Sequence, residues 1–126
     1  MLERADLVAF VPCGDLVVSG RFYGELLGLR LLEASEFANA YDANGTQLRV
    51  TLVDRPARAP YTVLGWRVAD LTATLRALRA AGVEFKRYDG MNQDADCVWT
   101  APGGSRIAWF ADPYGNVISL QQPPAG

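Results

Sequence analysis

Residues 111–120 read ADPYGNVISL, and this stretch decides how the rest of the chain is interpreted. Its Asp-Pro pair suits the first two positions of a tight turn, and Gly115 suits the fourth position, where φ is positive. Apolar runs lie on both sides of the turn, at residues 107–111 and 117–120. The stretch therefore predicts a β-hairpin with a glycine bulge after its turn.

A weaker copy of the hairpin lies earlier in the chain, at residues 42–50, which read DANGTQLRV. Before each hairpin an aspartate predicts the start of a helix, Asp15 in the first case and Asp70 in the second. Each helix is expected to end at a glycine, Gly28 or Gly82, because glycine readily adopts the left-handed conformation that closes a helix. The same features in the same order predict a duplicated structural module.

The order of elements expected in each module is β-α-β-β-β. The first module is predicted over residues 5–53 and the second over residues 61–121. Residues 54–60 between them contain two prolines and charges of both signs, which is typical of a linker. The fold class is therefore α+β, with both modules in a single domain over residues 1–126, a length that suits one domain with a sizeable core.

Composition excludes several classes of function. The net charge is −2 and no basic run is present, so we expect no nucleic-acid partner. The apolar runs are shorter than a membrane span and the first residues do not resemble a signal peptide, so we expect no membrane association. Cys13 and Cys97 lack metal-site spacing and suit reduced thiols, which predicts a cytoplasmic location. The chain has no histidine, which removes Ser-His-Asp and Cys-His catalysis and histidine-based zinc or iron sites.

Three stretches together resemble one known superfamily. They are residues 22–29 (FYGELLGL), residues 68–83 (VADLTATLRALRAAGV) and residues 110–120 (FADPYGNVISL). In this order they resemble the vicinal oxygen chelate superfamily, which includes glyoxalase I, extradiol dioxygenases, fosfomycin-resistance enzymes and bleomycin-binding proteins. Residues 93–110 are also similar to short bacterial glyoxalase-like proteins. The resemblance implies two βαβββ modules whose sheets curl around one ligand cavity, and a homodimer.

Enzymes of this superfamily hold a divalent metal with four side chains, usually His, Glu or Gln, from the first and last strands of each module. Counting from the helix starts and the turn glycines places these positions at Val8, Val63, Arg49 and Ser119. The first three cannot bind a metal and Ser119 is a poor ligand. A central arginine would also repel a cation. The expectation is therefore that the chain uses no metal and no other cofactor.

The alternation of side chains along the strands predicts what lines the cavity instead. If Asp42 pairs with Thr46, then Asn39 lies opposite Arg49 and shares its face. The same construction places Tyr41 opposite Gln47, Phe37 opposite Thr51, and Trp109 opposite Ser119. The predicted ligand-binding residues are Val8, Phe10, Phe37, Asn39, Tyr41, Gln47, Arg49, Val63, Trp109 and Ser119.

This lining suits a small organic molecule with a flat aromatic part and an acidic or carbonyl group. Arg49 would anchor the anion, unless it pairs internally with Asp6 or Glu36. Trp109 either stacks on the ligand or packs in the core. The aromatic and cationic lining, without a catalytic set, predicts a metal-free binding protein that sequesters a drug or metabolite.

Three alternatives to a binding protein stay open. One is a metal-independent isomerase or lyase acting on a carbonyl compound, in which Arg49 stabilises an enolate and Tyr41 or Asp6 carries the proton. Another is a metal-dependent glyoxalase- or dioxygenase-type enzyme that recruits Asp6 as a ligand. The third is a subunit that acts through protein contacts. The sequence leaves open whether the protein is an enzyme, and the missing metal ligands favour binding alone.

Overall fold

The computed structural model describes residues 1–125 and divides the chain into two compact units, residues 1–58 and residues 59 onward. The boundary falls inside the predicted linker, residues 54–60. The last residue of the predicted domain, Gly126, lies outside the described residues. Over the described part of the chain, no helix is long and apolar enough to cross a membrane.

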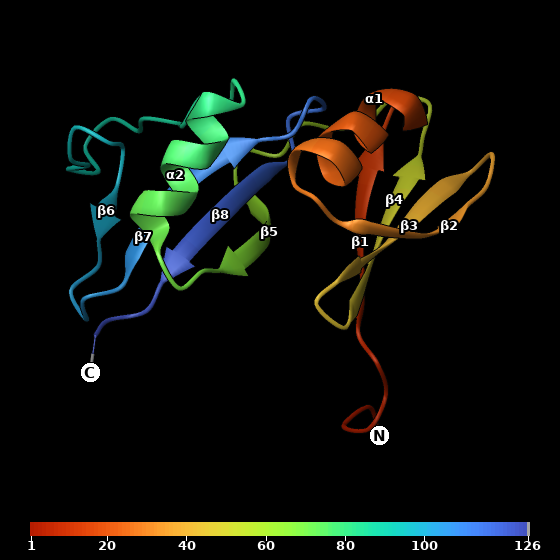
Figure 1. Ribbon diagram of the computed structural model, residues 1–126, viewed down its shortest axis with the longest axis horizontal. Helices are drawn as coiled ribbons and strands as arrows, with labels where there is room; N and C mark the ends of the chain where they lie inside the picture. The colour runs from red at the N-terminus through yellow and green to blue at the C-terminus, as the bar shows by residue number, and fades with distance from the viewer. Residues whose placement is uncertain (126) are drawn as a thin grey trace. The chain divides into compact units, whose positions relative to one another are not determined.

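The first unit is a four-stranded sheet with one helical segment (Figure 1). Its elements are β1 (Val8–Cys13), α1 (Leu16–Gly20), the π-helix η1 (Arg21–Leu26), β2 (Arg30–Ala34), β3 (Ala38–Ala43) and β4 (Thr46–Leu52). The strand order is β1-β4-β3-β2, with β1 parallel to β4 and the other pairs antiparallel. This is the predicted βαβββ module.

The helical segment begins and ends where the sequence predicts. The side chain of Asp15 accepts hydrogen bonds from the amides of Val17 and Val18, at 2.8 and 3.2 Å. Gly28 follows the segment with φ of +77°, a conformation that glycine adopts without strain. The turns of η1 are wider than those of an α-helix, which the sequence pattern did not indicate, and they bury Phe22 and Tyr23 with ring centroids 4.9 Å apart.

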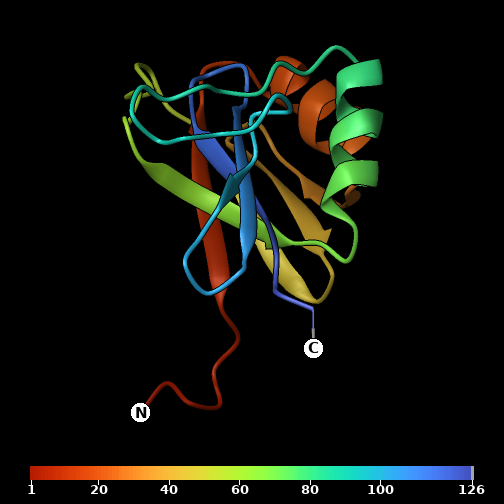
Figure 2. The same cartoon turned by 90° about the vertical axis from the view of Figure 1, so that its left-hand side faces the viewer.

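The second unit repeats this plan. Its elements are β5 (Thr62–Arg67), α2 (Leu71–Ala80), β6 (Trp99–Thr100), β7 (Arg106–Ala111) and β8 (Val117–Gln122), with strand order β5-β8-β7-β6. Figure 2 shows α2 lying along one face of this sheet. The helix buries Leu71, Leu75 and Leu78, which recur at helical spacing on its inner side.

The sequence favours a strand over residues 84–88, directly after the second helix, and this expectation is wrong. This segment contains no regular strand, although the amide of Lys86 donates to the carbonyl of Trp109 on β7 at 2.8 Å. The side chain of Gln93 holds the segment in place of a continuous ladder. Its amide nitrogen donates to the carbonyls of Lys86 and Cys97 at 2.9 and 2.8 Å, and its oxygen accepts from the amide of Tyr88 at 2.7 Å.

Each sheet has a face covered by its helix and an opposite face, which we call the open face. On the helix side of the first sheet, Val11, Leu48 and Val50 are at most 1% exposed. On the helix side of the second, Ala108, Phe110 and Ile118 are fully buried. The alternation of strand residues then assigns Arg49 and Ser119 to the two open faces, as the sequence predicts.

The two hairpin turns are not copies of each other. In the second unit, Gly115 donates to the carbonyl of Asp112 at 3.0 Å and has φ of +78°, which gives the predicted turn with a glycine bulge. In the first unit, Ala43 pairs with Thr46, so the loop has only two residues. Both loop residues have positive φ, +51° at Asn44 and +96° at Gly45. The predicted pairing of Asp42 with Thr46 is therefore wrong by one residue.

Candidate small-molecule site

Arg49 lies at the centre of the open face of the first sheet. Its neighbours across the ladder are Phe10 on β1 and Ala40 on β3. Phe10 is 63% exposed, while Ala40 is buried at 2%. Along the same face, Val8 pairs with Gln47, so four of the predicted site residues share this surface. Their placement on one face is confirmed, and their part in ligand binding stays a prediction.

The guanidinium of Arg49 has no ion pair and no hydrogen bond to any residue from 1 to 125. The alternative pairing with Asp6 or Glu36 is thus not formed within this range. Another carboxylate of this sheet, Asp42, forms an ion pair with Arg30, with 3.5 Å between its oxygen and the guanidinium nitrogen. The Arg49 side chain is half-buried, so it has lost part of its hydration without gaining a protein partner.

Three predicted site residues do not share the face of Arg49 as expected. Because the first hairpin has a two-residue loop, Tyr41 pairs with Leu48 and Asn39 with Val50, which places both on the helix side. Asn39 accordingly donates to the carbonyl of Leu16 in α1, at 3.4 Å. Phe37 precedes β3 and is 66% exposed, and the residue opposite Thr51 is Ala38 rather than Phe37.

Tyr41 is part of the core of the first unit rather than of a ligand cavity. Its ring is 2% exposed and lies 6.3 Å from that of Tyr23, centroid to centroid. Burial raises the pKa of the Tyr41 phenol above its usual range, and the hydrogen bond from the Asn39 side-chain amide opposes this rise in part. Tyr41 is therefore ruled out as the proton carrier of the isomerase or lyase alternative, for which the sequence offered Tyr41 or Asp6, because the phenol and Arg49 lie on opposite faces of the sheet.

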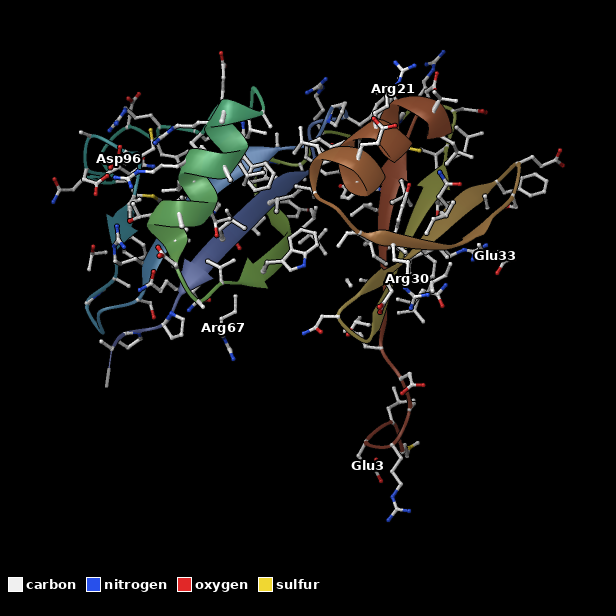
Figure 3. All side chains as sticks on the ribbon, in the orientation of Figure 1. Glu3, Arg21, Arg30, Glu33, Arg67 and Asp96 are labelled. Carbon is white, nitrogen blue, oxygen red and sulfur yellow. The ribbon has the colours of Figure 1, made fainter. Side chains whose placement is uncertain are left out.

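Ser119 lies on the open face of the second sheet, between Gly65 on β5 and Trp109 on β7. The pairing of Trp109 with Ser119 is the predicted register. Val63 lies where the register between β5 and β8 shifts, so the ladder does not fix the face that it occupies. Figure 3 shows the labelled side chain of Arg67, two residues beyond Gly65, extending away from its strand.

Aromatic side chains gather around Trp109. Trp99 pairs across the strands with Ile107 and its ring lies 6.4 Å from that of Trp109. Tyr88 meets Trp109 edge to face at 5.6 Å. Burial raises the pKa of the Tyr88 phenol. Tyr88 was missed by the sequence analysis because it lies in an irregular segment, where no periodic pattern indicates which way a side chain points.

The four positions that hold the metal in related enzymes do not fit a divalent cation here. Two are valines, Arg49 brings a positive charge, and Ser119 offers one neutral hydroxyl. Across residues 1–125, no three His, Cys, Asp or Glu side chains come together in a group that could hold a metal ion.

These features define a protein of two βαβββ modules, each with one helix-covered and one open sheet face. The chain belongs to the Glyoxalase/Bleomycin resistance protein/Dioxygenase superfamily, whose family model matches residues 5–120. The superfamily and fold class inferred from the sequence are thus confirmed. A search of curated proteins found no match.

Solved structures agree with this assignment. A glyoxalase/bleomycin resistance protein from Catenulispora acidiphila is 25% identical, with a TM-score of 0.68 over 94% of this chain and 98% of that one. A superfamily member from Sphaerobacter thermophilus is 19% identical, with a TM-score of 0.74 over 97% and 99%. A lactoylglutathione lyase from Agrobacterium tumefaciens is 14% identical, with a TM-score of 0.75 over 97% and 96%. The last two likenesses show the fold alone.

Proposed function

We propose that the chain is a metal-free binding protein for a small organic anion, and that it sequesters a drug or metabolite of this kind. The observation that supports this most strongly is the half-buried guanidinium of Arg49, which has no partner in residues 1–125. An arginine that has lost part of its hydration gains free energy when an anion binds to it.

The neighbours of Arg49 favour a flat carboxylate as the ligand. The planar guanidinium matches the two oxygens of a carboxylate, which it can bind through parallel hydrogen bonds. Phe10, beside it in the ladder, offers an exposed ring against which a flat group can stack. Gln47, two residues along β4, supplies an amide on the same face. Together they suit an aryl carboxylate.

The enzymatic alternatives have less support. An isomerase or lyase needs a group that moves a proton near Arg49, and Tyr41 cannot serve because it lies on the helix side. Asp6 is the remaining candidate, and it precedes β1 in an exposed position. We therefore propose binding without turnover. The cytoplasmic location also stays part of this proposal.

Calorimetric titration with benzoate and 1-naphthoate tests the proposal. We expect both to bind, with the naphthoate binding more tightly because its larger ring covers more of Phe10. Arg49→Ala should weaken the binding of both by about tenfold or more, since a charge-assisted hydrogen bond contributes roughly 1.5–3 kcal/mol. The matched control is Arg55→Ala, which removes an exposed arginine from the linker and should leave binding unchanged.

Benzamide, which is uncharged, provides the second control. If it binds as tightly as benzoate, or if Arg49→Ala binds benzoate like the unmodified protein, the proposal is wrong. The homodimer that the resemblance implies stays a separate prediction. Sedimentation equilibrium would test it, and a single species of monomer mass would contradict it.

A further inference from the structure

Gly65 and Ser119 form an unusual pair on the open face of the second sheet. A Cβ atom built on Gly65 would lie 2.6 Å from the Ser119 hydroxyl oxygen, which is closer than nonbonded atoms approach. The hydroxyl therefore occupies the place that a side chain at position 65 would need. Because β5 and β7 flank β8 on opposite sides, the Ser119 hydroxyl leans toward β5 and away from Trp109.

Because the Ser119 hydroxyl points toward β5, the neighbouring strand residues cover little of the side of the Trp109 indole that faces β8. Across the row, Gly65 has no side chain, and Ser119 is small and turned away. Tyr88 and Trp99 contact the indole of Trp109 from other elements, at 5.6 and 6.4 Å between ring centroids. Trp109 is thus held in place by aromatic neighbours and remains only half-buried.

We propose that Trp109 stacks against a flat, uncharged heteroaromatic ring, and that Gly65 makes this possible by accepting the Ser119 hydroxyl. The ring would lie over the β8 side of the indole, above the Cβ atom of Ser119. The hydroxyl makes no hydrogen bond within residues 1–125, so it is free to donate to a carbonyl at the edge of the ring. This site uses no residue of the first unit and does not rest on the role of Arg49.

Caffeine is a suitable probe, because it is flat, uncharged and carries carbonyl groups at its ring edge. We expect it to bind in a calorimetric titration and to quench tryptophan fluorescence on stacking. Trp109→Leu should weaken binding by about tenfold, the scale of one lost stacking contact. Trp66→Leu is the matched control, since Trp66 pairs with Leu120 on the helix side and should not affect binding.

A double-mutant cycle tests the role of Gly65. Gly65→Ala should push the Ser119 hydroxyl toward Trp109 and weaken caffeine binding by about tenfold. Ser119→Ala alone should change binding by less than about threefold, the loss of one edge hydrogen bond. Combining Gly65→Ala with Ser119→Ala should restore binding to the level of Ser119→Ala, because the two Cβ atoms are then 3.9 Å apart, an ordinary contact.

The proposal is overturned if caffeine does not bind, or if Trp109→Leu binds it like the unmodified protein. The role of Gly65 is overturned if Gly65→Ala binds caffeine normally. It is also overturned if the Gly65→Ala variant is folded and adding Ser119→Ala does not restore caffeine binding. Should Gly65→Ala not fold, which circular dichroism would show, the Trp109→Leu and Trp66→Leu pair still decides the proposal. Arg49→Ala should bind caffeine normally, so this result and that of the benzoate titration are independent.

Discussion

The two open faces have the same order of strands, but their large and small side chains lie on opposite strands. In the first sheet the large side chains, Phe10 and Arg49, are on β1 and β4, and the small Ala40 is on β3. In the second sheet the corresponding row has its small residues on β5 and β8 and its large one on β7. These are Gly65, Ser119 and Trp109.

The helix sides do not differ in this way, since both are apolar and buried. Repetition of the fold therefore depends on the helix sides, which form the cores, while the open faces are free to differ. The turns show a second difference of the same kind, because one pattern, Asp-x-x-Gly, serves a two-residue loop in one unit and a longer loop in the other.

The largest expected effect is a difference in stability between variants of the two turn aspartates, Asp112 and Asp42. Asp112 is 5% exposed, and its carboxylate accepts from the amides of Tyr114 and Asn116 and from the Asn116 side chain, at 2.7–3.0 Å. We expect Asp112→Ala to lower the free energy of unfolding by about 3 kcal/mol, because several buried donors lose a charged partner. Urea denaturation measures this.

Asp42→Ala is the matched variant in the first turn. This carboxylate accepts one backbone hydrogen bond, from Gly45 at 2.8 Å, and one at 3.5 Å from the exposed Arg30, and its side chain is 30% exposed. Its loss should cost about 0.5–1 kcal/mol, because water replaces the carboxylate. Equal costs for the two variants would contradict the difference between the turns.

The next effect concerns the outer edges of the sheets. In the first unit β2 is held by a backbone ladder, whereas in the second Gln93 holds residues 86–97 through three hydrogen bonds to the backbone. Gln93→Glu should lower the free energy of unfolding by about 2 kcal/mol, because a carboxylate cannot donate to the two carbonyls.

Gln122→Glu is not a suitable control for this change. The Gln122 side chain only accepts a hydrogen bond, from the amide of Leu71, and a carboxylate could still accept it. Gln47→Glu on β4 is a better control. No hydrogen bond of its side chain is formed within the described residues, so the change should cost less than about 0.5 kcal/mol. A similar loss in both variants would show that Gln93 has no special part in the second unit.

A smaller effect on stability is expected at high pH, from one tyrosine in each unit, Tyr41 and Tyr88. Burial raises the pKa of Tyr41 and of Tyr88, so each keeps its proton in the folded chain at a pH where the unfolded chain loses it. Their contribution to stability is therefore fully present below pH ~10 and is lost as the pH rises through the folded values.

Tyr41→Phe and Tyr88→Phe should each reduce the decline of stability above pH ~10, measured by urea denaturation at a series of pH values. Phenolate absorbance would follow each tyrosine directly. Ionisation of Tyr41 at or below pH ~10, the ordinary value for a phenol, would contradict the expected direction.

The smallest effect on stability should come from Arg49→Met. The guanidinium has no partner in the described chain, and methionine preserves most of the packing volume of the stem. The free energy of unfolding should change by less than about 0.5 kcal/mol, while benzoate binding weakens by about tenfold or more, as in Arg49→Ala. A large destabilisation would show that Arg49 has a structural role.

Much of the fold was predictable because its signals are local. Capping aspartates, positive-φ glycines and alternating apolar residues each depend on neighbours within a few positions, and they located both helices and the hairpin at residues 107–121. The register of the second hairpin was correct because Pro113 cannot adopt positive φ, so a two-residue loop is excluded there.

The first hairpin was misjudged because Asn44 tolerates positive φ and the sequence permits both loop lengths. That one-residue difference moved Asn39 and Tyr41 from the predicted site to the helix side. The environment of Trp109 was only partly predictable for another reason. Tyr88 is positioned by the hydrogen bond from its amide to the Gln93 side chain and by the nearby backbone hydrogen bond from Lys86 to Trp109. Neither leaves a periodic pattern in the sequence.

The outer strand β2 has a consequence for how the protein behaves in a crowded solution. All five of its residues are exposed, and its register shifts between Leu31 and Glu33. Arg30 and Glu33, both labelled in Figure 3, are charged residues of this short strand. A strand that is short, irregular and charged is a poor template for the edge of another sheet. The feature that interrupts the ladder thus also protects two exposed leucines from starting aggregation.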